Sequence, residues 1–356
     1  VLCIPAVFCS YTGITLDKKA PLLRSIEAVS KEAMRIVKLV DPETEATKVG
    51  ASVGPEQEYF LVDREMYAKR EDLILAGRSL YGAPAPKGQE LEDHYFGTIK
   101  TRVQAYMKDL DEQLWRLGIY AKTKHNEVAP AQHELAPIYG TTNIATDHNQ
   151  LTMEIMKRTA RKHGFKCLLH EKPFAGINGS GKHNNWSLGT DNGVNLLDPG
   201  DTPNENIQFL LVLACILKAV DTHADLLRQS ASDVGNDHRL GANEAPPAII
   251  SVFLGEQLED VVKQLVEYGR SLEKSNNKKF RFTLTTNGIL LNDEILEFVN
   301  KEMGNIVLSI DGRKEINDKM RPFRGGQGSY DIIVPKFQKV AESRDQMNYY
   351  VRGTFT

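Results

Sequence analysis

Five side chains of the types that hold divalent cations lie in three separate segments of the sequence. Glu56 and Glu58 belong to GPEQEYFLVD, Glu127 and Glu134 to HNEVAPAQHE, and His183 to KHNNWSL. Carboxylate oxygens suit hard cations such as Mg²⁺, and imidazole accompanies them in many transition-metal sites. Each segment alone is more often a solvated polar surface, so a metal site requires a fold that brings the three together.

The conformation of the second segment can be inferred from its proline. Pro130 excludes a helix that carries both Glu127 and Glu134. Two short extended pieces joined at residues 128–131 would instead turn the two carboxylates toward one point. Carboxylates brought this close repel each other unless they share a proton or a cation.

A strand is expected to position the first pair of glutamates. After the Gly-Pro break at residues 54–55, a strand over residues 56–62 places Glu56 and Glu58 on the same face. Residues 64–97 are rich in glycine, proline and charge and predict a long loop. Such a loop within a compact domain is more often functional or interfacial than idle.

A glycine-rich loop precedes the histidine. Asn178 and Gly179 open the sequence NGSG, whose glycines allow the backbone to approach a substrate closely. His183, Asn185 and Ser187 would then alternate onto one face of the outgoing strand. A lone histidine is more often a polar surface residue, but downstream of two glutamate pairs it is a candidate fifth ligand.

Hydrophobic periodicity predicts two domains with different patterns. Before residue 258 it predicts strands at residues 1–10 and 165–170 and helices at 21–39, 98–117, 142–163 and 203–230. After residue 258, alternating elements are typical of parallel strands with crossover helices. Those elements are helices at 261–272 and 293–301 and strands at 280–285, 306–310 and 349–355. We therefore predict domains over residues 1–257 and 258–356.

Composition limits the partners that the chain could have. The 356 residues are 41% hydrophobic and 26% charged with a net charge of −3, so neither nucleic acid nor an anionic membrane is an expected partner. The longest apolar run, residues 209–216, is too short to span a bilayer. Four cysteines without a CxxC pair suit a reducing compartment, so we predict a cytoplasmic protein that binds small molecules.

Arg239 is a candidate for binding phosphate. It lies in NDHRLGANE, between Asp237 and Asn243. A planar guanidinium is well suited to clamp phosphate oxygens, but the same surroundings also fit a surface salt bridge. The residues alone leave both interpretations open.

The amino-acid sequences of four segments resemble those of the type III glutamine synthetases, and the resemblance extends over about residues 1–257. The segments are GPEQEYFLVD, KHNEVAPAQHELAP, KPFAGINGSGKHNNWSL and NDHRLGANEAPPAIIS. The resemblance implies an α+β fold in which an antiparallel catalytic sheet is covered by helices. It also implies a ligase that phosphorylates the glutamate side chain with ATP and then admits ammonia, in a homo-oligomer.

The resemblance assigns roles residue by residue. Mg²⁺ or Mn²⁺ would occupy two sites, one ordering glutamate and one bridging the phosphates of ATP. Glu58, Glu127 and Glu134 match ligands of the first metal, and Glu56 and His183 match ligands of the second. The substrate residues complete the set: Asn178 and Gly179 for glutamate, Asn185, Ser187 and Arg239 for ATP, with Arg239 and Glu127 closest to the chemistry.

Two parts of the family pattern are expected to be missing. The last metal-ligand glutamate follows NEAPPAIIS in the family and has no counterpart segment in this chain. We also expect the chain to lack the N-terminal region that, in the family, completes the active site of a neighbouring subunit. The second metal would then have two ligands where the family uses three. The sequence therefore leaves open whether the chain is active or is an inactive chimera.

The tail resembles a different family, the radical SAM maturases of Cys-rich peptides and sulfatases. Its segments FRFTLTTNGILLNDEILEF and NIVLSIDGRKEINDKMRPFRGGQGSYD imply part of a βα barrel that lines S-adenosylmethionine. Thr286, Asn287, Ser309 and Asp311 match that lining. With no cysteine after Cys215, we expect no iron-sulfur cluster, and a maturase fragment without its cluster loop is a further alternative.

Overall fold

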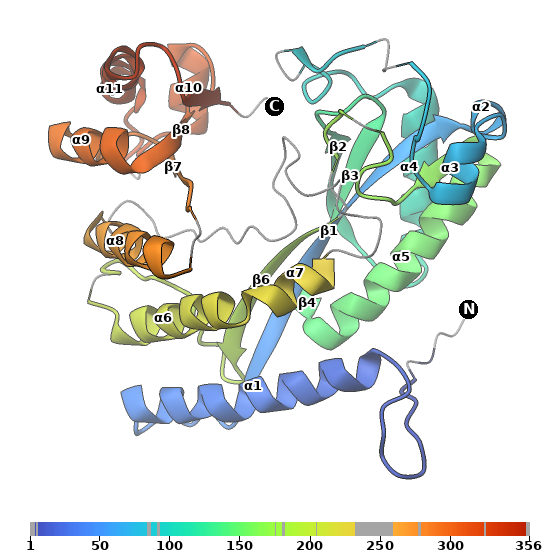
Figure 1. The fold of residues 1–356 in the computed structure, drawn as a ribbon, viewed down its shortest axis with the longest axis horizontal. Coiled ribbons are helices and arrows are strands. Elements are labelled where there is room, and N and C mark those ends of the chain that lie inside the picture. The colour runs from blue at the N-terminus through green and yellow to red at the C-terminus, as the bar shows by residue number, and fades with distance from the viewer. Residues whose placement is uncertain are drawn as a thin grey trace. The chain divides into compact units, whose positions relative to one another are not determined.

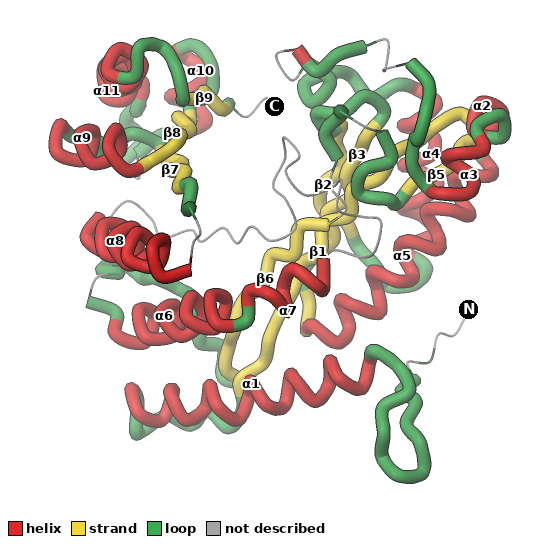
Figure 2. Tube along the Cα trace, viewed as in Figure 1, coloured by secondary structure: helices red, strands yellow, loops and turns green. Residues whose placement is uncertain are grey.

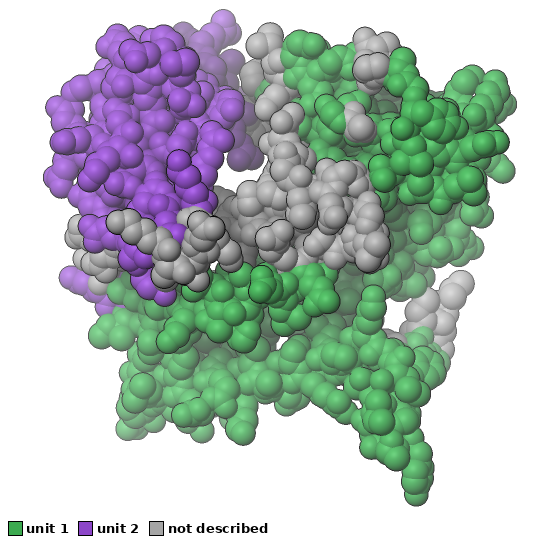
Figure 3. All heavy atoms as spheres, in the orientation of Figure 1, with its two compact units in different colours: residues 1–198, 207–251 green, residues 199–206, 252–356 purple. Residues whose placement is uncertain are grey.

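The computed structural model divides the chain into two units (Figure 3). It describes residues 4, 6–83, 87–90, 93–174, 176–179, 182–203, 205–231, 259–276, 279–323 and 325–353. Unit 1 comprises residues 1–198 and 207–251, and unit 2 comprises residues 199–206 and 252–356. The predicted assignment of two separate domains to two protein families stays a prediction.

Unit 1 is organised around one long strand, β1 (Val49–Asp63), to which four other strands pair directly (Figure 2). All of these pairings are antiparallel, as predicted for the first domain. β2 joins the sheet through β3, so the described residues of this sheet form six strands. The partners are β2 (Ala121–Asn126), β3 (Gln132–Pro137), β4 (Gly140–Thr141), β5 (Phe165–Leu168) and β6 (Lys182–Thr190).

β1 begins earlier than predicted and continues through the Gly-Pro pair. Proline has no N–H to donate and is normally excluded from a strand that is paired on both sides. At Pro55 the strand pairs with Asn184 of β6, whereas the β4 pairing ends at Val53 and the β3 pairing begins at Gln57. The proline therefore lies where β1 has a strand partner on one side.

The two faces of β1 have different surroundings, as its alternation predicts. Tyr59 and Leu61 pack into the main core with Leu110 of α4 (Thr101–Trp115) and Met156 of α5 (Thr142–Lys162). Phe60, on the other face, packs in a smaller cluster. Because Glu56 and Glu58 alternate with Tyr59 and Leu61 along β1, they lie on the face of the sheet opposite the core to which α4 and α5 contribute. Figure 1 shows α5 beside β1.

Most predicted helices of unit 1 are confirmed. α1, α4 and α5 match predictions within a few residues, whereas the helix predicted over 203–230 is divided at His223 into α6 and α7. Two short helices, α2 and α3, interrupt the predicted loop at 64–97. Within the described part of the chain, no helix has the length and apolar character needed to cross a membrane. The helices are α1 (Lys19–Val40), α2 (Arg64–Tyr67), α3 (Glu71–Ala76), α4 (Thr101–Trp115), α5 (Thr142–Lys162), α6 (Ile207–Thr222) and α7 (Ala224–Ala231).

The strand predicted at residues 1–10 is wrong for the part that the structure describes. Cys9 forms a single bridge with Thr15 around a turn in which Gly13 donates to the Ser10 carbonyl. Phe8 is 63% exposed, so its apolar side chain is not paired into a buried sheet face. An apolar, alternating sequence forms a stable strand only when a partner strand and a covered face are present.

Unit 2 contains a three-stranded sheet in the order β7-β8-β9, and both pairings are parallel, as predicted. Val299, Ile306 and Ile333 are fully buried in its core. Two of its helices, α10 and α11, were not predicted. The elements are α8 (Glu259–Asn276), β7 (Phe282–Thr286), α9 (Asp293–Glu302), β8 (Met303–Ser309), α10 (Lys314–Met320), α11 (Tyr330–Ser343) and β9 (Tyr349–Arg352).

Candidate metal centre

Strand register brings the predicted cation ligands of unit 1 together. Glu58 of β1 lies opposite Glu134 of β3, and Glu134 in turn lies opposite His125 of β2. On the other edge of β1, Glu56 lies opposite His183 of β6. Four neighbouring strands therefore place their acidic and imidazole side chains on one face of the sheet.

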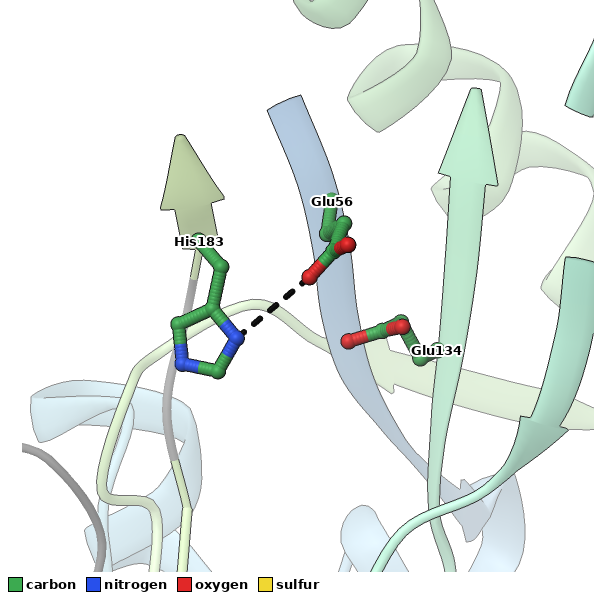
Figure 4. A group of neighbouring side chains, drawn as sticks. All are labelled: Glu56, Glu134 and His183. Carbon is green, nitrogen blue, oxygen red and sulfur yellow. Dashed lines mark ion pairs between the residues drawn. The ribbon is translucent and has the colours of Figure 1, made fainter. Parts of the chain in front are cut away.

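Glu56, Glu134 and His183 form the first group of possible ligands (Figure 4). One ligand atom of each lies within 4.8 Å of the others. The Nδ1 atom of His183 lies 3.4 Å from Glu56 Oε2 and 3.6 Å from Glu58 Oε1. Figure 4 shows the three side chains pointing toward one another from separate strands.

His125, Glu127 and Glu134 form the second group. His125 Nε2 lies 3.1 Å from Glu134 Oε1, and His125 Nδ1 lies 3.2 Å from Glu127 Oε1. Glu127 follows β2, and its N–H donates to the Gln132 carbonyl across the turn. Glu134 belongs to both groups and so connects them.

The turn between Glu127 and Glu134 is the predicted one. β2 ends at Asn126 and β3 begins at Gln132, so the two glutamates come from two extended pieces. Ala131 completes the turn with φ of 62°, in the left-handed region. This conformation costs of order 1–3 kcal/mol for a residue other than glycine, and strain of this kind is found preferentially at functional sites.

Burial makes the charge of the site costly. Glu58 is 2% exposed, Glu134 7% and Glu127 9%. Neutral side chains satisfy some of their oxygens: Gln132 Nε2 donates to Glu58 Oε2 at 2.9 Å, while Asn185 Nδ2 donates to Glu56 Oε1 at 2.9 Å. Buried carboxylates are stable when paired with cations, so this set of oxygen donors with imidazole fits Mg²⁺ or Mn²⁺.

The histidines respond to the carboxylates around them. A hydrogen bond to Glu56 raises the pKa of His183 to about 9, and the same contact lowers the pKa of Glu56. A hydrogen bond to Glu134 raises the pKa of His125 to about 9. The surrounding carboxylates therefore favour the protonated form of both imidazoles.

The grouping differs from the sequence-based allocation of ligands. The sequence assigned Glu134 to one metal with Glu58 and Glu127, and left Glu56 and His183 as an incomplete pair. The structure brings Glu134 within reach of that pair. A third donor for the second position is thus present among the predicted residues themselves.

Among the predicted substrate residues that the structure describes, Asn185 contacts a glutamate of this site directly. Asn178 is 8% exposed, and a Cβ atom at Gly179 would meet the Glu171 carbonyl at 2.5 Å, so this position requires glycine. Asn185 contacts Glu56 as described, and Ser187 donates to Asn195 Oδ1 at 2.6 Å. Arg239 lies outside the described residues, and its role stays a prediction.

The predicted residues of unit 2 lie at the carboxyl ends of β7 and β8. Thr286 Oγ1 accepts the N–H of Gly288 at 2.9 Å, and Asn287 Oδ1 accepts the N–H of Ile289 at 2.9 Å. Asp311 pairs with Arg321. These contacts support the local turns.

The deciding comparison is with protein-family models. The model described as "Glutamine synthetase, catalytic domain" matches residues 35–246, which is more than half of the chain. The chain belongs to the glutamine synthetase family. A second model, "Glutamine synthetase type III N terminal", matches residues 1–25, so the resemblance to the type III branch is confirmed.

Individual relatives agree with this assignment. The chain is 60% identical over 278 residues to a glutamine synthetase of Butyrivibrio fibrisolvens, covering 78% of this chain and 39% of that protein. It is 55% identical over 266 residues to the type-3 glutamine synthetase of Dictyostelium discoideum, covering 75% of this chain and 36% of that protein. The chain therefore spans well under half the length of these curated relatives.

Among solved structures, the Plasmodium falciparum glutamine synthetase is similar with 21% identity and a TM-score of 0.38. The similarity covers 52% of this chain and 37% of that one.

His125 is the site residue to which sequence reasoning gave no role. It lies in the same segment as Glu127 and Glu134 but differs from them in type. Alternation along β2 shows which residues share a face with His125, but only the register of β2 against β3 shows that His125 lies opposite Glu134. The pairing of β2 with β3 supplies that register.

Proposed function

We propose that the glutamine synthetase part of this chain, residues 1–257, is a catalytic region for joining ammonia to glutamate. In that reaction the γ-phosphoryl group of ATP passes to the side-chain carboxylate of glutamate, and ammonia then displaces phosphate. The observation that carries the proposal is the convergence of Glu56, Glu58, Glu127, Glu134 and His183 on one sheet face in a chain of this family.

Mg²⁺ or Mn²⁺ is the cation that we assign to this face. Such an ion, when bound, neutralises charge that develops on transferring phosphoryl oxygens. Glu127 and Glu134 with Glu58 would hold the ion next to glutamate, and Glu56 with His183 the ion next to ATP. Because Glu134 belongs to both groups of possible ligands, its carboxylate could donate to either ion.

The remaining predicted residues complete the proposal. Asn178 and Gly179 would contact glutamate, and the burial of Asn178 supports a defined position for its side chain. Asn185, Ser187 and Arg239 would contact ATP. The hydrogen bond from Asn185 to Glu56 supports a nucleotide position beside the second ion.

The setting of the enzyme is inferred from the family. We propose a cytoplasmic homo-oligomer with glutamate, ammonia and ATP as its small-molecule partners. The net charge of −3 supports the prediction that neither nucleic acid nor an anionic membrane binds.

Ligand-dependent thermal unfolding tests this function. Mn²⁺ at 100 times its Kd should stabilise the chain by about 2.7 kcal/mol, because the ion binds the folded state. Glutamate and ATP should each add a further increase in Tm in the presence of Mn²⁺. The Glu127→Ala chain should lose the Mn²⁺-dependent increase, because Glu127 is one of the three donors of its group.

The matched control is Glu154→Ala, which removes an exposed acid from α5 in the same unit. This variant should keep the full response to Mn²⁺. An equal response in the Glu127→Ala chain, or no response to any ligand in the unaltered chain, would contradict the proposal and favour an inactive chimera.

We also propose that unit 2 is a fragment of a radical SAM barrel without a cluster. The parallel order β7-β8-β9, with Thr286 and Asp311 at the carboxyl ends of two strands, supports this origin. After anaerobic reconstitution with iron and sulfide, the chain should show no cluster absorbance, because residues 252–356 contain no cysteine. A stoichiometric cluster spectrum would overturn this expectation.

A further inference from the structure

One side chain of the segment between α3 and α4, that of Gln89, contacts the loop that carries Asn178. Gln89 Oε1 accepts the backbone N–H of Asn178 at 2.8 Å, across 89 residues of sequence. Its described neighbours Lys87, Gly88 and Glu90 are exposed, whereas Gln89 is half-buried. Gln89 is therefore turned inward while the described residues beside it remain exposed, so its orientation does not result from burial of the whole segment.

A second side chain holds the other end of the same peptide group. Lys172 Nζ donates to the carbonyl of Ile177 at 2.7 Å, and Lys172 is 7% exposed. The Ile177 carbonyl and the Asn178 N–H belong to one planar unit, in which they point in opposite directions. Gln89 and Lys172 thus form hydrogen bonds with that peptide group from both sides and fix the orientation of its plane.

Fixing this plane also fixes the direction in which the Asn178 side chain leaves the backbone. Asn178 is 8% exposed, and within the described residues its Oδ1 atom has no hydrogen-bond partner. An unmatched buried acceptor of this kind is costly and suits a ligand that brings an N–H donor. The α-ammonium group of an amino acid is such a donor.

We propose that Gln89 is a positioning residue that, together with Lys172, holds Asn178 in the orientation that binds an amino acid substrate. This inference rests on the proposed function, in which Asn178 contacts glutamate. Gln89 itself acts through the Ile177–Asn178 peptide group and does not belong to the metal ligands. Its contribution is therefore to glutamate affinity and not to metal affinity.

The test compares Gln89→Met, which keeps the length of the side chain but removes the acceptor, with Lys87→Met, which alters an exposed neighbour. Hydrogen exchange at the Asn178 amide should quicken at least tenfold in Gln89→Met and stay unchanged in Lys87→Met. Glutamate titrated in the presence of saturating Mn²⁺ should bind Gln89→Met about tenfold more weakly, which corresponds to about 1.4 kcal/mol. The Kd for Mn²⁺ should stay that of the unaltered chain.

Gln89→Glu provides the rescue, since a carboxylate oxygen at the same position still accepts the Asn178 N–H. It should restore slow exchange at this amide. Slow exchange in Gln89→Met, or an unchanged glutamate Kd despite fast exchange, would overturn the inference. If the unaltered chain binds no glutamate, that result contradicts the proposed function and with it the inference about Gln89. The result comes from the unaltered chain alone and so differs from a failure of the Gln89→Met comparison.

Discussion

Asp311 of unit 2 and the glutamate cluster of unit 1, Glu56, Glu58, Glu127 and Glu134, are neutralised in different ways. In unit 2, both oxygens of Asp311 are met by the guanidinium of Arg321, at 2.7 and 3.2 Å. Among the described residues of unit 1, His125 and His183 contact Glu56, Glu58, Glu127 and Glu134, so two imidazoles lie beside four carboxylates. The difference indicates that Asp311 serves the stability of its own unit, whereas the glutamates suit an external divalent cation.

The geometry of the cationic partners supports the same distinction. A planar guanidinium engages a carboxylate through two parallel hydrogen bonds and leaves little room for another ligand. The imidazoles of His125 and His183 each lie within 3.6 Å of carboxylate oxygens of two different glutamates, in an arrangement that an ion can replace. Arg321 is thus a fixed partner within the fold of unit 2, whereas the imidazoles of His125 and His183 are partners that a metal ion can replace.

The largest expected effect breaks the pair in unit 2. Arg321→Met should lower the free energy of unfolding of unit 2 by about 2–3 kcal/mol, because Asp311 loses its charged partner. The value is below that of a fully buried pair because the Arg321 side chain is 29% exposed. Hydrogen exchange of amides in β8 should report the loss, while those in β1 keep their rates.

The compensated variant is the control for that experiment. Arg321→Met combined with Asp311→Leu should regain most of the lost stability, since an apolar pair replaces a buried ion pair at little cost. Equal stability of the single variant and the unaltered chain would mean that Asp311 does not need Arg321.

A smaller effect concerns pH and distinguishes the two units. His183 and His125 have folded-state pKa values of about 9, above the ordinary value of 6.5. A raised pKa stabilises the folded state fully below pH 6.5, and that stabilisation is lost as pH rises through about 9. The metal-free chain should therefore show a decline in the stability of unit 1 between pH 6.5 and 9.5.

Unit 2 serves as the internal reference, because residues 199–206 and 252–356 contain no histidine. Unfolding followed by hydrogen exchange in each unit separates the two responses. His183→Asn should flatten the decline in unit 1, and a decline of the same size in this variant would show that other groups cause it.

The convergence of the site could be predicted in part from the sequence. Pro130 alone excluded a helix, and alternation placed Glu56 and Glu58 on one face, both of which the structure confirms. The sharing of Glu134 could not be predicted, since it depends on the register of β3 against β1 and β2. Register is set by the turn at Ala131 and by core packing, which no local pattern reveals.

The fold was predictable to a similar degree and for similar reasons. Strong amphipathic periodicity identified α1, α4 and α5. α11 was missed because Pro335 lies inside it, where local rules predict a break. The strand expected at residues 1–10 failed because local alternation does not guarantee a partner strand, as the single bridge at Cys9 shows.

Calorimetric titration of Mn²⁺ into the metal-free chain at pH 7.5 tests the central claim most directly. The account predicts saturable binding whose heat depends on the ionisation enthalpy of the buffer, because the ion displaces protons from His183 and His125. Glu134→Gln, which removes the carboxylate shared by both groups, should weaken this binding by at least tenfold. Absence of saturable binding, or equal binding by the Glu134→Gln chain, would contradict the assignment of this sheet face as a metal centre.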